Sequence, residues 1–418
     1  MKIALVNTYL KGGAGIACNR LATALNKSGI EADLLVQEAV SPTANLHSVT
    51  TSSIQEFFNK VRLAKEVFHF AKNERSKQDR FKFSVAKTGI DVSAHPVVRK
   101  ADIIHLHWIN QGFLSLASIK KLSRLNKPIV WTMHDMWPFT GGCHYSQGCE
   151  NYQIECRYCP YLKTPSAHDL SNETWKRKLE LLDAMNIAFV GCSHWIKDLA
   201  QKSALLKKFR IENIPNPIDT DLFKPLDKTE ARQKLNLSPD KKILLFGAMD
   251  VQDKRKGFEY LEKSLKILSS QNPESIQSME VLVIGKSKID LSRSFPYKIN
   301  QLGVVSSSQQ MALAYSAANL FVLPSIEDNL PNMIMESMAC ATPVVAFNTG
   351  GIPEMIDHKL NGFLAEYKNE KSLSEGIQFI LSSAKYLELS LNSRTKIVQN
   401  YKEEVVAQKY NDLYKSLK

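Results

Sequence analysis

The segment from Leu320 to Phe347 has side chains and spacing suited to binding an anionic ligand. It has the pattern of an apolar strand, an acidic turn, a helix that begins near Pro331 and a second apolar strand. Proline suits the first turn of a helix because its missing N–H would have no intrahelical partner there. Backbone amides at that positive end of the helix dipole can hold a diphosphate. The residues expected around the diphosphate are Asn329, Leu330, Pro331 and Asn332.

A carboxylate on the same helix is placed to bind the ribose of a nucleotide. Glu336 lies five residues beyond Pro331, which is about 7–8 Å along a helix that rises 1.5 Å per residue. That step suits the distance from a diphosphate to a ribose, whose two hydroxyls a carboxylate can accept. Taken alone, Glu336 would be read as an exposed helix residue and the nearby Asp328 as a helix cap.

A cationic loop comes earlier in the same half of the chain. Gly247–Phe258 reads GAMDVQDKRKGF and follows an apolar run. Its Arg255 and Lys256 could neutralise the charge that a departing nucleoside diphosphate develops. The alternative is a solvated run of charges without a ligand.

Two features of the first half could also contribute to a site. Gly13 lies in a Gly-Gly-Ala-Gly sequence between an apolar run and a helical stretch, but its spacing is not that of the dinucleotide fingerprint. His134 follows the apolar run Val130–Met133, and a polar residue at such a strand tip is placed to face an interdomain cleft. A lone histidine is more often structural, so neither feature is decisive by itself.

Four of the seven cysteines fall within 17 residues of one another. Thiolates at such short spacing can close a tetrahedral zinc site that holds an irregular loop together. One or two disulfides, or free thiols, are the alternatives. The clustered residues are Cys143, Cys149, Cys156 and Cys159, whereas Cys18, Cys192 and Cys340 lie in apolar windows typical of core residues.

These residues need a scaffold, and apolar, β-branched runs separated by amphipathic stretches predict one made of parallel sheets. The first series of runs is Lys2–Asn7, Ala32–Gln37, Ala101–His107, Pro128–Asp135, Ala188–Ser193 and Phe209–Ile214. The second series is Lys242–Phe246, Val281–Gly285, Gln301–Val305, Leu320–Ser325, Pro343–Phe347 and Phe363–Glu366. The chain is therefore expected to be an α/β protein with two Rossmann-like, doubly wound parallel-sheet domains facing each other across a cleft.

The turn-rich segment Ile214–Pro225 contains three prolines and predicts the linker between the domains. We expect an N-terminal domain at residues 1–217, with a Cys-rich loop at 140–162, and a C-terminal domain at residues 218–395. The remaining residues, 396–418, are helical in composition, and we expect them to cross back to the first domain.

The chain carries a formal net charge of +12, which favours anionic partners without choosing among nucleic acid, phospholipid and phosphorylated substrates. Much of the excess lies between Lys60 and Lys87, where cations alternate with phenylalanines. This segment is either a solvated helix face over a packed apolar one or a docking surface for an anionic membrane. No apolar run approaches the roughly 20 residues of a membrane-spanning helix, and the N-terminus lacks the pattern of a secretory signal. We therefore expect a soluble cytoplasmic protein that docks peripherally on the inner membrane face.

With these motifs the sequence resembles glycosyltransferase family 4, the retaining enzymes of the two-Rossmann GT-B architecture. In that family a strand ending in Pro-Ser is followed by an acidic residue, by a Glu at the eighth step, and by Pro-Val-Val. This chain has Asp328 and Glu336 at that spacing, before Pro343-Val344-Val345. It departs from the family in having Asp328 where a Glu is usual. The resemblance extends to Thr132–Asp135, Lys256-Gly257 and Gly350–Glu354, and it covers most of the chain.

The resemblance implies the roles of the individual residues. Asp328 would hold hydroxyls of the donor sugar, and Lys256 with Arg255 would stabilise the leaving diphosphate. His134 would orient the sugar or the acceptor, and the glycine loop with Gly13 would lie over the donor phosphate. No Asp-x-Asp pair stands in the matching place, so catalysis is expected to need no metal and no other catalytic cofactor.

The implied activity is transfer of a hexosyl group from a UDP- or GDP-sugar to a saccharide or lipid-linked saccharide, as in polysaccharide or lipopolysaccharide assembly. A sugar-nucleotide epimerase of the same architecture is the main rival, although the Asp328 and Glu336 helix argues against it. A basic nucleic-acid-binding protein with a zinc knuckle would leave that helix unexplained, so nucleic acid is not an expected partner. A non-catalytic sugar-binding module is the third alternative.

Overall fold

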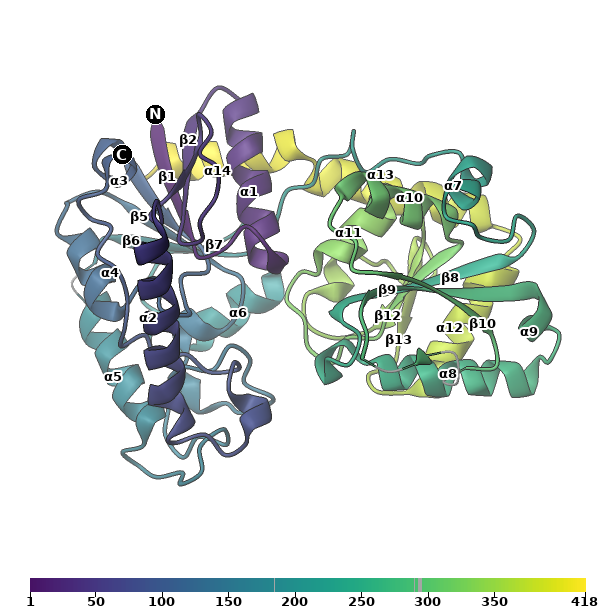
Figure 1. Cartoon of the computed structure of the whole chain (residues 1–418), viewed down its shortest axis with the longest axis horizontal. Coiled ribbons are helices and arrows are strands. Elements are labelled where there is room, and N and C mark those ends of the chain that lie inside the picture. The colour runs from purple at the N-terminus through teal and green to yellow at the C-terminus, as the bar shows by residue number, and fades with distance from the viewer. Residues whose placement is uncertain (184, 289, 292–294) are drawn as a thin grey trace. The chain divides into compact units, whose positions relative to one another are not determined.

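The computed structural model describes residues 1–183, 185–288, 290–291 and 295–418, and the chain divides into two compact units (Figure 1). Unit 1 comprises Met1–Asn216 together with Val406–Lys418, and unit 2 comprises Pro217–Val405. The first boundary lies one residue before the expected position. The segment that returns to unit 1 begins at Val406 rather than at residue 396, because the helix over Tyr386–Tyr401 belongs to unit 2.

Unit 1 is built on a seven-stranded parallel sheet in the order β3-β2-β1-β4-β5-β6-β7. All six expected strands are present, and the edge strand β3 is an addition. It has only three residues, too few to show a hydrophobic period. The strands are β1 (Lys2–Asn7), β2 (Glu31–Val36), β3 (Leu46–Ser48), β4 (Ile103–Leu106), β5 (Ile129–Met133), β6 (Ile187–Gly191) and β7 (Ile211–Asn213).

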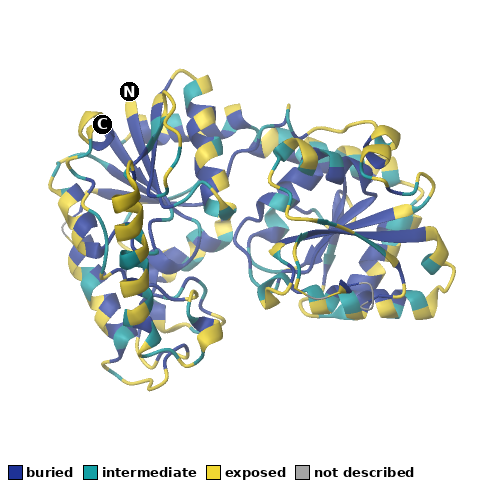
Figure 2. Cartoon of the chain, viewed as in Figure 1, coloured by how far each residue is buried: buried dark blue, intermediate teal, exposed yellow. Residues whose placement is uncertain are grey.

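Helices cover the central strands of this sheet, whose residues are buried throughout β4, β5 and β6 (Figure 2). Burial on both faces explains why these strands read as continuous apolar runs rather than as alternating patterns. The helices are α1 (Gly12–Lys27), α2 (Ser53–Ala71), α3 (Pro96–Lys100), α4 (Leu116–Ser123), α5 (Leu170–Leu182), α6 (His194–Lys202) and α14 (Glu403–Lys415).

The returning helix α14 completes one of the apolar clusters of unit 1. Its Val406, Tyr410 and Tyr414 are buried in the same apolar cluster as residues of β1, β2 and α1. Another cluster lies against α4, α5 and α6, and a smaller one joins Phe70 of α2 to the Cys-rich loop. Unit 1 is therefore assembled from both ends of the chain (Figure 1).

Unit 2 has a six-stranded parallel sheet in the order β10-β9-β8-β11-β12-β13, as expected from the second series of apolar runs. The strands are β8 (Lys242–Asp250), β9 (Met279–Lys286), β10 (Lys298–Gly303), β11 (Leu320–Leu323), β12 (Val344–Phe347) and β13 (Gly362–Ala365). The helices are α7 (Lys228–Lys234), α8 (Phe258–Gln271), α9 (Ser275–Ser278), α10 (Ser308–Ala317), α11 (Asn332–Ala339), α12 (Glu370–Ser382) and α13 (Tyr386–Tyr401).

In both sheets the expected site residues follow the carboxyl ends of central strands, where open α/β sheets bind their ligands. His134 follows β5, and Asp328 lies between β11 and α11. Within the described parts of the chain, no helix combines the length and the apolar character needed to span a membrane.

Candidate active-site residues in the two units

In unit 2, Asp328 and Lys256 form a partly buried ion pair at the end of the central strands. The Nζ atom of Lys256 lies 2.5 Å from Oδ2 of Asp328, and the hydroxyl of Ser325 donates to the same oxygen at 3.2 Å. Asp328 is only 8% exposed. The structure thus brings together two residues that lie far apart in the sequence and that were both predicted to face the donor.

Arg255 adds a second cation to this pair. Its Nη1 atom lies 3.5 Å from Oδ2 of Asp328 and donates to the carbonyl of Glu327 at 3.0 Å. Burial alone would raise the pKa of Asp328, but Lys256 and Arg255 outweigh that effect and hold the pKa below its ordinary value. The carboxylate is therefore charged at neutral pH. Arg255 also pairs with Asp253, whose Oδ2 atom lies 3.7 Å from its Nη2 atom, so the two cations face two carboxylates.

Two glycines let the backbone close around this cluster. Gly257 follows Lys256 with φ of +71°, and a Cβ there would come within 1.9 Å of the carbonyl oxygen of Pro324. Gly350 has φ of +59°, and a Cβ there would come within 1.9 Å of the carbonyl oxygen of Asp328. Only glycine combines this conformation with such close approach, which accounts for the Lys-Gly and Gly-Gly elements noted in the sequence.

The helix after Asp328 begins one residue later than Pro331 suggested. Pro331 is the N-cap of α11, and the first helical residue is Asn332. The first-turn amides of a helix have no intrahelical acceptor, so the start of α11 still offers donors to an anion. Asn329, Leu330 and Asn332 are buried beside this turn, so the four predicted diphosphate residues are contiguous at the start of one helix.

Glu336 is buried on α11 rather than exposed, which excludes the alternative of a solvent-facing helix residue. It is 6% exposed, and its Oε2 atom accepts a hydrogen bond of 3.0 Å from the hydroxyl of Tyr315 on α10. The carbonyl of Tyr315 in turn accepts from the Thr342 hydroxyl at 2.7 Å. This chain of bonds fixes the carboxylate that was predicted to bind the ribose.

In unit 1, His134 is paired with a second histidine that the sequence analysis had not singled out. Nδ1 of His107 lies 2.9 Å from Nε2 of His134, and Sγ of Cys192 lies 3.6 Å from Nδ1 of His134. Burial lowers the pKa of His134 to about 4 and lowers that of His107 as well. Both imidazoles are neutral at pH 7, and one donates its N–H to the other.

A third histidine ties α14 to the same strands. His105 contacts the Tyr414 hydroxyl through Nδ1 and the Thr132 hydroxyl through Nε2, both at 2.7 Å. Thr132 Oγ1 also lies 2.9 Å from the Tyr410 hydroxyl. Thr132 lies on β5, two residues before His134. The returning helix therefore helps to fix the strand that leads to His134.

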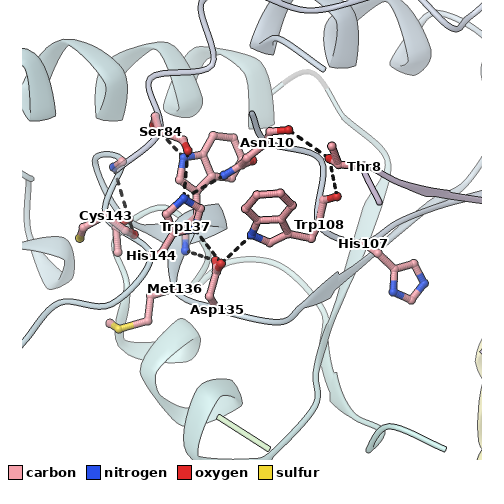
Figure 3. Close-up of polar contacts among 12 residues, drawn as sticks. Thr8, Ser84, His107, Trp108, Asn110, Asp135, Met136, Trp137, Cys143 and His144 are labelled. Atoms are coloured by element: carbon pink, nitrogen blue, oxygen red, sulfur yellow. Dashed lines mark hydrogen bonds and ion pairs between the residues drawn. The ribbon is translucent and has the colours of Figure 1, made fainter. Parts of the chain in front are cut away.

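Asp135 belongs to a separate network that holds the following loop, and His107 points away from it (Figure 3). Its Oδ2 atom lies 2.7 Å from Nδ1 of His144 and accepts from Nε1 of Trp108 at 2.9 Å. Nε2 of His144 lies 2.9 Å from the Ser84 hydroxyl. All of these groups are at least partly buried, so the Ser-His-Asp arrangement anchors the loop to β5.

The loop anchored in this way contains the four clustered cysteines. Cys143, Cys149, Cys156 and Cys159 line one small cavity and are all free thiols. Burial raises the pKa of Cys143 and of Cys159 to about 12. As the described side chains are placed, however, no three of the His, Cys, Asp and Glu groups form a set that could hold a metal ion.

The zinc site therefore stays a prediction, and the present geometry does not fit it. Metal analysis of the purified chain tests it directly. About one zinc per chain would support the prediction, whereas four titratable thiols without zinc would contradict it.

Gly13 is the second residue of α1, so the segment predicted to be a glycine loop over the donor phosphate forms the first turn of a helix. A Cβ at Gly13 would meet no atom within 4 Å, whereas one at Gly15 would clash with the Tyr9 carbonyl at 2.4 Å. Packing within the chain therefore explains glycine at position 15 but not at position 13. Open space at Gly13 is compatible with close approach of a ligand to the backbone.

Comparison with known families identifies the class of protein. The model described as Glycosyltransferase Family 4 matches residues 11–222, just over half of the chain, and Glycosyl transferases group 1 matches residues 240–383. The chain belongs to glycosyltransferase family 4. The family predicted from the motifs is thereby confirmed, and so is glycosyltransferase activity at this general level.

Individual relatives of this family 4 glycosyltransferase are distant. An uncharacterized glycosyltransferase of Methanocaldococcus jannaschii is 25% identical and aligns with 99% of this chain and 98% of its own. The putative colanic acid biosynthesis glycosyl transferase WcaC of Escherichia coli is also 25% identical, over 63% of each chain.

Solved structures establish the GT-B fold. Sucrose-phosphate synthase from Thermosynechococcus elongatus matches with a TM-score of 0.68 at 20% identity, covering 100% of this chain and 98% of that one. Anabaena HepE in complex with UDP matches with a TM-score of 0.64 at 16% identity, covering 100% of both chains.

Proposed function

We propose that this family 4 enzyme transfers a sugar, with retention of configuration, from a UDP- or GDP-sugar to a saccharide or lipid-linked saccharide in cell-surface polysaccharide assembly. The observation that carries the donor assignment is the arrangement on α11. The helix has buried residues around its first turn, a Lys256–Asp328 ion pair before it and Glu336 fixed within it by Tyr315.

The cluster before α11 suits the departing diphosphate. Lys256 and Arg255 both face Asp328, and Arg255 is shared with the exposed Asp253. A diphosphate that arrives at the start of α11 would share Lys256 and Arg255 with Asp328 and would gain the first-turn amides. Asp328 would then be available to the hydroxyls of the donor sugar, one carbon shorter than the usual glutamate.

Retention follows most simply from attack on the face that the diphosphate is leaving. The bond from the acceptor oxygen to the anomeric carbon forms as the bond to the diphosphate oxygen breaks, and the acceptor proton passes to that diphosphate oxygen. No enzymic nucleophile and no metal is needed, because the two cations stabilise the charge that develops. His134 would orient the sugar or the acceptor as a neutral hydrogen-bonding group.

The names of similar proteins support this choice of substrates. One solved relative is HepE in complex with UDP-glucose, and one curated relative is a UDP-galactose-dependent transferase that acts on a diphosphoundecaprenol-linked sugar. The latter is 23% identical over 60% of this chain and 67% of its own. Both names point to a nucleotide-sugar donor, and the second points to a lipid-linked acceptor.

A panel of UDP- and GDP-sugars tests the proposal by thermal shift, followed by transfer assays with the donor that stabilises most. The expected result is strong stabilisation by one nucleotide class and a product with the donor's anomeric configuration, formed in the presence of EDTA. Turnover of the donor without any acceptor to an epimeric nucleotide-sugar would favour an epimerase instead. Loss of transfer in EDTA would contradict the metal-independent mechanism.

A further inference from the structure

The outer face of α2 in unit 1 is more apolar than a solvent-facing helix surface should be. Three large side chains on it are more than half exposed, Ile54 at 69%, Phe57 at 61% and Phe58 at 51%. Phe68, at 56%, lies on the same face because helix positions turn by about 100° per residue. Figure 2 shows α2 exposed along its length. The alternative of a solvated face over a packed apolar one therefore holds for Phe70 but not for Phe57, Phe58 and Phe68.

The inner face of α2 is held by polar groups, so the exposed aromatics are not displaced core residues. Glu66 is buried and accepts hydrogen bonds from the Lys87 amide at 3.1 Å and the Thr88 hydroxyl at 3.2 Å. Phe70, the other buried residue of α2, stacks on Phe83 at 4.7 Å. The helix is thus fixed in an orientation that presents Ile54, Phe57 and Phe58 outward.

Cations flank this apolar stripe, and most nearby carboxylates are already neutralised. Glu56 pairs with Lys60 at 2.8 Å, and Asp79 pairs with Lys82 at 3.0 Å. Lys65, Lys72 and Lys77 are exposed and have no ion pair within the described residues. Nζ of Lys72 lies 4.3 Å from the centre of the Phe68 ring, an arrangement that keeps charge beside an aromatic surface.

A cavity of about 390 Å³ lies at the carboxyl end of the same helix. His69 and Lys72 of α2 line it together with Lys87, His168 and the residues Thr164 and Ser166. Its two carboxylates are already engaged. Asp169 caps α5, and Glu173 pairs with Lys87 at 2.8 Å. Because Lys87 is engaged in that pair, the groups that remain are the Lys72 ammonium, imidazoles and hydroxyls, which can donate hydrogen bonds to a phosphate.

We propose that the outer face of α2 docks on a bilayer containing anionic phospholipids, and that the cavity beside Lys72 receives a lipid phosphate. The exposed phenylalanines would enter the interface while the lysines meet the negative surface. This docking proposal rests on the proposed function, because docking would bring unit 1 to a membrane that holds a lipid-linked acceptor. Charge complementarity favours a membrane over a second copy of this strongly basic chain.

Sedimentation with vesicles tests the docking face. The full chain should bind vesicles of phosphatidylcholine with phosphatidylglycerol and should bind pure phosphatidylcholine at least tenfold more weakly. Two double variants should each lower vesicle binding at least tenfold: Phe57→Ser with Phe58→Ser, and Lys65→Glu with Lys72→Glu. The first removes apolar side chains from the interface. The second removes two lysines, each of which contributes about 1 kcal/mol, or about fivefold, near an anionic surface. The lysine contribution should fall at high salt.

Matched controls separate docking from general effects. Leu387→Ser with Leu391→Ser changes two equally exposed apolar residues of unit 2, and Lys120→Glu changes an exposed lysine of α4. Both controls should bind vesicles like the wild type. For the cavity, Lys72→Gln should weaken binding more than Lys77→Gln, because Lys77 does not line it; equal effects would overturn the phosphate pocket.

Thermal shift with the stabilising nucleotide-sugar measures donor binding separately from vesicle binding. It therefore distinguishes a failure of the docking proposal from a failure of the proposed function. The α2 variants should bind the donor normally even when vesicle binding is lost. Vesicle binding that is absent, or unchanged in both α2 variants, would overturn the docking proposal whatever the donor result. A wild-type dimer that Phe57→Ser with Phe58→Ser converts to a monomer would make this face a subunit interface and overturn it too.

Discussion

Units 1 and 2 place polar side chains at the same position, after the carboxyl ends of central parallel strands, but the electrostatics of the two positions differ. In unit 2, Lys256, Arg255 and Asp328 form a cluster of charged side chains. In unit 1, His107 and His134 are kept neutral by burial. The difference suits a division of labour in which unit 2 holds an anionic donor and unit 1 offers uncharged hydrogen-bonding groups.

Removing the central cation of unit 2 should have the largest effect. Lys256→Met should lower transfer by about 10²–10³-fold, because a positioned cation that stabilises developing charge contributes on that scale. Lys254→Met is the matched control, since Lys254 is exposed two residues away. Steady-state kinetics of the two variants provide the comparison, and equal activities would remove Lys256 from the site.

Removing the neutral histidine of unit 1 should have a smaller and more selective effect. His134→Ala should lower transfer by about tenfold, the worth of a hydrogen bond of about 1.4 kcal/mol, and should leave donor binding unchanged. Donor titration alongside turnover separates the two effects. An equal loss of donor affinity, or wild-type turnover, would contradict the assignment; exposed His358→Ala should behave like the wild type.

A finer change tests the proposed ribose site of unit 2. Tyr315→Phe removes only the hydroxyl that bonds Glu336, and it should weaken nucleotide binding by about three- to tenfold. It should also reduce discrimination between the ribonucleotide and its 2′-deoxy analogue, which a purely structural defect would leave intact. Tyr297→Phe is the control, because the buried Tyr297 hydroxyl lies 2.8 Å from Ser275 Oγ instead.

Acid should affect unit 1 before unit 2. His105 and His134 have pKa values of about 3 and about 4 in the folded chain because of burial, below the ordinary value of 6.5. The unfolded chain therefore binds these protons more tightly, and unit 1 should lose stability as the pH falls from about 6.5 towards 4. The pKa of Asp328 lies below 3.8, so its protonation should lower the stability of unit 2 only at more acidic pH.

Hydrogen exchange followed by mass spectrometry at pH values between 7 and 4.5 can report the two units separately. The expected result is a loss of protection in β4 and β5 that precedes any loss in β8 and β11. Simultaneous loss in both sheets, or earlier loss in unit 2, would show that the buried histidines do not control acid sensitivity.

Much of the scaffold was predictable because strands buried on both faces of a parallel sheet consist of continuous apolar residues. All of the strands except β3 were expected. The proposed donor residues Asp328 and Glu336 could be singled out because they lie on one short segment with a fixed spacing. Contacts between distant segments were not. Tyr315 lies one strand and one turn away from Glu336, and its hydroxyl bond depends on how α10 packs against α11.

His105 and His107 show that the sequence also contains a signal for buried polar contacts in unit 1. His105 and His107 alternate at the end of a buried strand, where two polar side chains in an apolar run require partners. The partners, Tyr414 and His134, lie on other elements, so the sequence could raise the question without answering it. The outward orientation of α2 likewise depends on Glu66, which accepts hydrogen bonds from backbone amides at residues 86–88. The periodicity of the sequence does not reveal these bonds.

The most direct test of the account is the affinity of the wild type and of Glu336→Ala for whichever of UDP and GDP binds, and for its 2′-deoxy form, by calorimetry. The wild type should prefer the ribonucleotide. Glu336→Ala should bind it about ten- to a hundredfold more weakly, the worth of hydrogen bonds to a charged group, and should no longer distinguish the deoxy form. Unchanged affinity and unchanged discrimination in Glu336→Ala would contradict the placement of the nucleotide on α11.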